Sequence, residues 1–138
     1  SDEMASLYRH PTVKAFVALT RGEGWGLPIL EAAASGLPVI ATNWSGHLDF
    51  LNHGRFIPVS YALTTIPDSK VDNKIFVPGA KWANPDENDA KEKLHKFRKK
   101  PDIPMQWANE LKKKLLVSFS QSAISNVYTE KLGHLMTC

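Results

Sequence analysis

Apolar residues occur in short continuous runs in the first third of the chain. Residues 15–19 and 38–42 are almost wholly apolar and too short for amphipathic helices, so each is predicted to be a buried strand. Between them a glycine-rich turn leads into a predicted helix at 27–35, which Pro28 favours at its start and Gly36 ends. Strand, turn, helix and strand within about 30 residues are typical of a right-handed βαβ unit with parallel strands, so the predicted fold class is α/β.

Further elements are expected on either side of this unit. The chain opens with a predicted helix at 1–9, where a hydroxyl and two acids resemble a capped helix start. A short helix is expected at 48–51 and a third strand at 55–59. The proline-rich residues 60–89 are predicted to form an extended excursion over the surface, with a candidate short strand at 74–77.

The last third of the chain is predicted to be helical. One helix is expected near residues 90–98, and a longer helical stretch follows Pro101 and Pro104. Residues 118–122 are predicted to divide this stretch into two helices. Apolar side chains recur four residues apart in both halves, at Trp107, Leu111 and Leu115 and at Ile124, Tyr128 and Leu132.

The composition fits one folded domain of 138 residues, because 43% hydrophobic residues suffice for a single core. We divide it into a βαβ core at 1–59, the excursion at 60–89 and closing helices at 90–138. No run approaches the roughly 18 apolar residues that span a bilayer, and no secretory pattern is present, so the expected compartment is the cytoplasm. The single cysteine, Cys138, excludes an internal disulfide.

Positive charge is concentrated in the second half of a chain whose net charge is +3, in residues 91–100 and 112–114. We interpret these lysines and arginines as solvated faces of amphipathic helices. The alternative is peripheral contact with an anionic membrane, where each lysine contributes about 1 kcal/mol. Nucleic acid is not an expected partner, because no aromatic residues alternate with the charges to stack on bases.

The candidate chemistry lies in residues 21–31, the loop after the first strand and the start of the next helix. Ligands of open α/β sheets bind at the carboxyl ends of strands, where this loop must lie. Its three glycines let the backbone approach a ligand, and the helix start offers unpaired N–H groups to a diphosphate. Glu23 and Glu31 would repel that anion unless each meets hydroxyl donors, such as those of sugar and ribose rings. A purely conformational interpretation treats Glu31 as an acid in the first helical turn and Trp25 as a cover for the loop.

Residues 23–31 resemble the motif of two glutamates separated by seven residues in the GT-B-fold retaining glycosyltransferases of family GT4. The resemblance is strong over residues 1–52 and looser afterwards. The loop at 44–49 is similar to the family's glycine-containing turn followed by an acid, and residues 82–86 to an element of a subgroup with an insertion here. The resemblance implies a Rossmann-like parallel sheet flanked by helices, the partial C-terminal half of a GT-B enzyme, with C-terminal helices.

The same resemblance implies an activity and a set of site residues. In the family, the first glutamate and the adjoining backbone amides contact the donor sugar, and the second glutamate binds the ribose hydroxyls. Glu23 is thus the implied catalytic residue. The implied nucleotide-sugar-binding residues are Glu23, Gly24, Trp25, Gly26, Leu27 and Glu31. The implied reaction transfers a sugar from a nucleoside-diphosphate sugar to an acceptor hydroxyl, with retention and without a metal or other cofactor.

The implied partners are the nucleotide sugar and an acceptor glycan, lipid or other hydroxyl compound. In the family, the matching region is preceded by an acceptor domain and by further βα units. Those units carry an arginine and a lysine that neutralise the diphosphate, and neither the domain nor the units precede Ser1 here. We therefore expect an excised fragment or a natural short form, inactive in isolation. The alternative is a non-catalytic nucleotide-sugar-binding or assembly module of the same fold. The histidines lack ligand spacing and are interpreted as surface or hydrogen-bonded structural residues; they are His10, His47, His53, His95 and His134.

Overall fold

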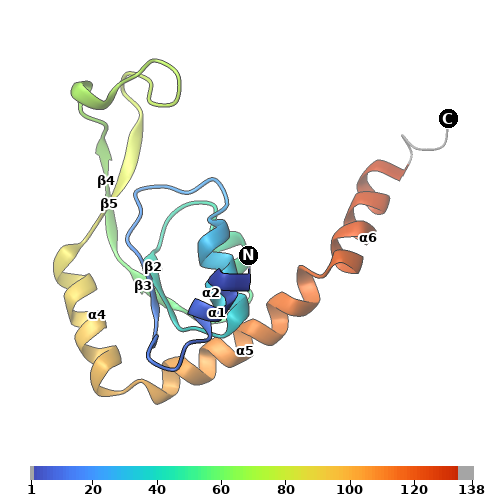
Figure 1. Cartoon of the computed structure of the whole chain (residues 1–138). Coiled ribbons are helices and arrows are strands. Elements are labelled where there is room, and N and C mark those ends of the chain that lie inside the picture. Colours follow the sequence, from blue (N-terminus) through green and yellow to red (C-terminus); the bar gives the residue numbers. More distant parts are fainter. Residues whose placement is uncertain (1, 134–138) are drawn as a thin grey trace.

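The computed structural model describes residues 2–133, so Ser1, His134 and Cys138 lie outside it. Its centre is a parallel three-stranded sheet in the order β1-β2-β3 (Figure 1). The strands are β1 (Phe16–Ala18), β2 (Val39–Thr42) and β3 (Ile57–Val59). They are joined by α2 (Leu27–Ser35), between β1 and β2, and by α3 (Leu48–Leu51), between β2 and β3. The predicted α/β class and parallel βαβ unit are confirmed.

Helices cover both faces of the sheet (Figure 1). On one face α1 (Asp2–Tyr8), α2 and α5 (Asp102–Ser118) pack together, and Val39 and Ala41 of β2 point into this layer. On the other face α4 (Glu87–Lys99) lies against β3, and Ile40 points toward its Phe97. Because β2 is covered on both sides, all of its residues are buried. This explains the continuous apolar run in the sequence.

Two glycines set the ends of α2. Gly26 precedes the helix with φ 81°, and Gly36 ends it with φ 94°, both in the left-handed region that favours glycine. The N–H of Gly36 donates to Ala33 O and the N–H of Leu37 donates to Ala32 O, which satisfies the last carbonyls. Ala32 and Ala33 are fully buried, so the helix packs closely on the sheet.

The excursion contains a β-hairpin that the sequence pattern does not predict. β4 (Tyr61–Thr65) and β5 (Lys81–Pro85) pair antiparallel and project from the sheet (Figure 1), with η1 (Asp68–Lys70) in the connection. The strand expected at 74–77 is wrong. The carboxylate of Asp72 accepts the backbone N–H groups of residues 74–76, each at 2.9 Å, and folds this segment into a turn.

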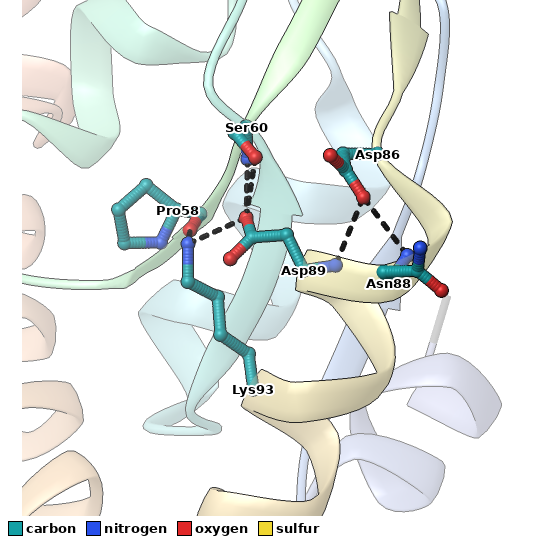
Figure 2. Close-up of polar contacts among 6 residues, drawn as sticks. All are labelled: Pro58, Ser60, Asp86, Asn88, Asp89 and Lys93. Carbon is teal, nitrogen blue, oxygen red and sulfur yellow. Dashed lines mark hydrogen bonds and ion pairs between the residues drawn. The ribbon is translucent and has the colours of Figure 1, made fainter.

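The carboxy-terminal helices form as predicted, with small differences at their ends. Asp86 caps α4 by accepting the N–H groups of Asn88 and Asp89 (Figure 2). Pro104 lies inside the first turn of α5, where its missing N–H is not needed. The predicted interruption is confirmed: Ser120 caps α6 (Gln121–Leu132), which has no buried residue and projects from the rest of the protein (Figure 1). Among residues 2–133, no helix is both long and apolar enough to cross a membrane.

Candidate functional site

Two loops meet at the carboxyl edge of the sheet, residues 19–26 after β1 and residues 43–47 after β2. Hydrogen bonds hold the backbone of Glu23 on both sides. Its carbonyl oxygen accepts from the N–H of Gly46 at 3.0 Å and from the hydroxyl of Ser45 at 2.7 Å. Its N–H donates to the same hydroxyl at 3.0 Å. The first glutamate therefore has a fixed position where ligands of parallel sheets bind.

Ser45 makes these bonds in an uncommon conformation. Its φ is 92°, in the region that disfavours residues with a Cβ atom, at a cost of roughly 1–2 kcal/mol. Such backbone strain persists only where surrounding contacts enforce it, and it clusters at functional sites. Here the enforced conformation brings the Ser45 hydroxyl to Glu23.

A cavity of about 750 Å³ lies between these loops and the excursion. Glu23 and Gly24 line it, as do Thr20, Arg21, Trp44, Ser45, Ile66, Phe76, Lys81 and Trp82. A cavity of this size, with apolar walls and a few polar groups, is typical of a small-molecule site. The structure therefore places the first glutamate of the motif in a cavity that the hairpin helps to form.

The hairpin is attached to the motif loop by two contacts. The N–H of Ala83 donates to the carbonyl oxygen of Arg21 at 3.0 Å. The guanidinium carbon of Arg21 lies 4.6 Å from the ring centroid of Trp82, a cation–π contact. The sequence pattern does not single out Arg21, Lys81 or Trp82 as site residues. In the sequence, the one feature that points to this region is the resemblance of residues 82–86 to a family element. That resemblance does not predict a contact with the motif loop.

Three other expected residues do not line this cavity. The ring of Trp25 packs on Phe50 at 5.4 Å and on Phe119 at 5.7 Å between centroids, so it closes the loop onto the core. Gly26 forms the entry to α2, and Leu27 is 57% exposed at the first helical position. Trp25 thus covers the loop, as the purely conformational interpretation of the sequence expects.

Glu31 lies in the second turn of α2, not in the first turn as expected, because the helix begins at Leu27 and has no acid in its first turn. The macrodipole of the helix start therefore does not account for this acid. Its side chain is exposed, outside the cavity that contains Glu23. Burial raises the pKa of the Tyr8 hydroxyl, and the nearby negative charge of Glu31 raises it further.

The family model described as "Glycosyl transferases group 1" matches residues 1–114. This chain belongs to the group 1 glycosyltransferases. A sucrose synthase from Melioribacter roseus is 34% identical over 87 residues, covering 54% of this chain and 11% of the relative. The chain thus spans about a tenth of the length of this curated relative. No solved structure matches significantly.

The family match contains both loops of the carboxyl edge, the hairpin and α4, and it stops within α5. This group 1 glycosyltransferase chain therefore has its motif loop, its cavity and the glutamate pair within the matched region. α6 lies beyond the match.

His47 differs from the expectation for the histidines, because it is fully buried and only one ring nitrogen has a partner. Its Nε2 lies 2.7 Å from the carbonyl oxygen of Thr42, while its Nδ1 has no partner among the described residues. The hydroxyls of Thr20 and Thr42 are also buried without a partner there. Within residues 2–133, no three or more histidine, cysteine, aspartate or glutamate side chains are grouped to hold a metal ion.

Proposed function

We propose that this chain is the donor-binding part of a glycosyltransferase that transfers a hexose from a nucleoside-diphosphate sugar to an acceptor hydroxyl, with retention of the anomeric configuration. The position of Glu23 carries this proposal: its backbone is held by Ser45 and Gly46, and it lines a cavity at the carboxyl edge of the sheet. Membership of the group 1 family supports the glycosyl-transfer chemistry, and the motif at 23–31 supports retention.

The donor sugar binds at Glu23 and Gly24 in this proposal. A carboxylate accepts hydrogen bonds from sugar hydroxyls, and such charge-assisted bonds are stronger than neutral ones. Glu23 is the catalytic residue, because it contacts the sugar whose bond to the leaving group breaks. No cofactor takes part.

The diphosphate lies at the start of α2. The carbonyl oxygen of Gly26 accepts the first helical bonds from Ile29 and Leu30, and the N–H groups of Gly26 and Leu27 have no backbone acceptor among the described residues. Free N–H groups at a helix start bind phosphate oxygens and stabilise the charge that develops on the leaving group. Trp25 holds this helix start against Phe50 and Phe119.

Glu31 binds the ribose hydroxyls at the far end of the donor. It lies four residues after Leu27, which places it about 6 Å along the axis at 1.5 Å per residue. The sugar, diphosphate and nucleoside then follow one another from the cavity toward α1. The order matches the order of Glu23, the helix start and Glu31 along the chain.

Calorimetric titration of the chain with uridine, guanosine and adenosine diphosphate sugars tests the proposal. We expect one donor class to bind, without added metal, and without release of the nucleoside diphosphate, because the chain alone is proposed to be inactive. Glu23→Gln is expected to weaken the binding of the nucleotide sugar but not the binding of the free nucleoside diphosphate. Failure of all three donors to bind, or binding that requires magnesium, would refute the proposal.

A further inference from the structure

A groove of about 450 Å³ lies where α4 and α5 meet β3, an outer strand of the sheet. Its walls are apolar side chains from all three elements, among them Phe97 and Trp107. Lys93, Lys96 and Lys100 also line it, and within the described part of the chain none of its lining residues is acidic. We call this surface the lysine-flanked groove.

The three lysines follow one side of α4, because spacings of three and four residues place side chains on the same helical face. Lys93 is already engaged, since it donates to the Asp89 carboxylate and to the carbonyl oxygen of Pro58 (Figure 2). Lys96 and Lys100 are exposed and have no carboxylate partner within residues 2–133. Two ammonium groups beside an apolar surface are therefore available to an anionic partner.

The apolar part of the groove is accessible from outside. Ile103, at the start of α5, lines the groove and is 56% exposed. Trp107 lies one helical turn further on, with the guanidinium carbon of Arg55 at 5.7 Å from its ring centroid. Apolar side chains flanked by lysines are typical of proteins that bind a lipid surface, where the lysine stems lie along the apolar region and the ammonium groups reach the phosphates. Tryptophan is enriched at the same boundary, whereas the cores of protein–protein interfaces are poor in lysine.

We propose that the lysine-flanked groove binds the surface of a membrane that contains anionic lipids. Lys96 and Lys100 bind the lipid phosphates, and Ile103 and Trp107 contact the acyl chains. The corner between α4 and α5 lies at the opposite end of the protein from the hairpin, so the cavity at Glu23 is turned away from the lipid (Figure 1). The membrane surface is therefore independent of the proposed donor function.

Co-sedimentation of the chain with phosphatidylcholine vesicles, with and without phosphatidylglycerol, tests the proposal. We expect binding only where the anionic lipid is present, and weaker binding as the salt concentration rises. Vesicles with brominated acyl chains quench the fluorescence of a tryptophan that the chains contact. Trp107 is the tryptophan that lines the groove, so the wild type is expected to be quenched and Trp107→Phe to be quenched little.

The double variant Lys96→Ala/Lys100→Ala is expected to weaken vesicle binding about 25-fold, because each lysine near an anionic surface contributes about fivefold. Ile103→Ser is expected to weaken binding without any change in charge. The matched control is Lys113→Ala/Lys114→Ala, which removes the same charge from exposed positions of α5 that do not line the groove. This control is expected to retain most of the affinity, and thermal unfolding checks that every variant folds.

The outcomes are distinct from those for the donor site. Equal binding to the two kinds of vesicle, or binding to neither, would overturn the proposed membrane surface. An equal loss in the two double variants would also overturn it, because the charge of the whole chain would then cause the binding. Vesicle binding without quenching of Trp107 would show that the groove does not meet the lipid. A chain that binds anionic vesicles through Lys96 and Lys100 but binds no nucleotide would support the membrane surface and refute the donor function alone.

Discussion

Gly46 lies directly against the backbone of Gly24: a Cβ atom added to residue 46 would be 2.0 Å from the carbonyl oxygen of Gly24. It would also be 2.9 Å from the carbonyl oxygen of Glu23, and both contacts are with backbone that cannot move aside easily. The two carboxyl-edge loops can therefore approach each other only because residue 46 is glycine. The position of Glu23 depends on a residue in a different loop.

Gly46→Ala is expected to destabilise the protein by about 1–3 kcal/mol, the usual range for overpacking a close contact. Urea denaturation followed by fluorescence measures the change. Gly24→Ala is the matched control for stability, because a Cβ atom there meets nothing within 4 Å. Equal stabilities for the two variants would show that the loops separate without penalty.

Ala33→Phe tests the packing of α2 on the sheet. Ala33 is fully buried among Val39, Ala41 and Phe50, which confirms the inward face expected from the small residues of the helix. A phenyl ring there is expected to lower the free energy of unfolding by about 1–3 kcal/mol or more, since the core has no room for it. The same replacement at the exposed Leu27 is the control and is expected to change the midpoint of thermal unfolding little.

The ion pair between Asp89 and Lys93 should make stability depend on pH. Lys93 and the N–H and hydroxyl of Ser60 donate to the Asp89 carboxylate and lower its pKa to about 2, and Lys93 also donates to the carbonyl of Pro58 (Figure 2). Because the pKa in the folded protein is depressed, this stabilisation is present above the ordinary value of 3.8 and is lost as the pH falls toward about 2. These contacts attach α4 to the base of the hairpin.

Asp89→Asn is expected to lower the midpoint of thermal unfolding at neutral pH, and the difference from the wild type should shrink below pH 3.8. Calorimetry across this range measures it. Glu87→Gln is the control, because the Glu87–Lys91 pair is exposed and connects residues of the same helix only. If the difference in unfolding midpoint between Asp89→Asn and the wild type stays constant as the pH falls below 3.8, the charge of Asp89 is not what stabilises the contact.

The sequence predicts the core of the fold better than the excursion, for physical reasons. The buried strands appear as apolar runs, and the ends of α2 appear as glycines that its geometry requires. β4 has four exposed residues out of five and so carries no apolar pattern, although it forms the hairpin. The apolar run at 74–77 misleads, since Ile75 is 80% exposed in the turn that Asp72 fixes.

The candidate site is likewise only partly visible in the sequence. The motif spacing identifies Glu23 and the start of α2, because the glycines and the proline have local conformational roles. Arg21 and Trp82 are 61 positions apart, and only the fold of the hairpin brings them into contact. The burial of His47, whose Nδ1 has no partner within residues 2–133, likewise depends on tertiary packing, which no local pattern records.

The most direct test of the proposed donor site is a double-mutant cycle between Glu31 and the ribose, measured calorimetrically with the nucleoside diphosphate that the chain binds best. A charged acceptor makes each hydrogen bond worth about 1.5–3 kcal/mol, so Glu31→Ala should weaken binding about tenfold or more. The 2′,3′-dideoxy nucleotide should bind the wild type as poorly as the normal nucleotide binds Glu31→Ala. It should bind Glu31→Ala about as well as the normal nucleotide does, because both changes remove the same interaction. Equal binding of the two nucleotides by the wild type would contradict the assignment of Glu31 to the ribose.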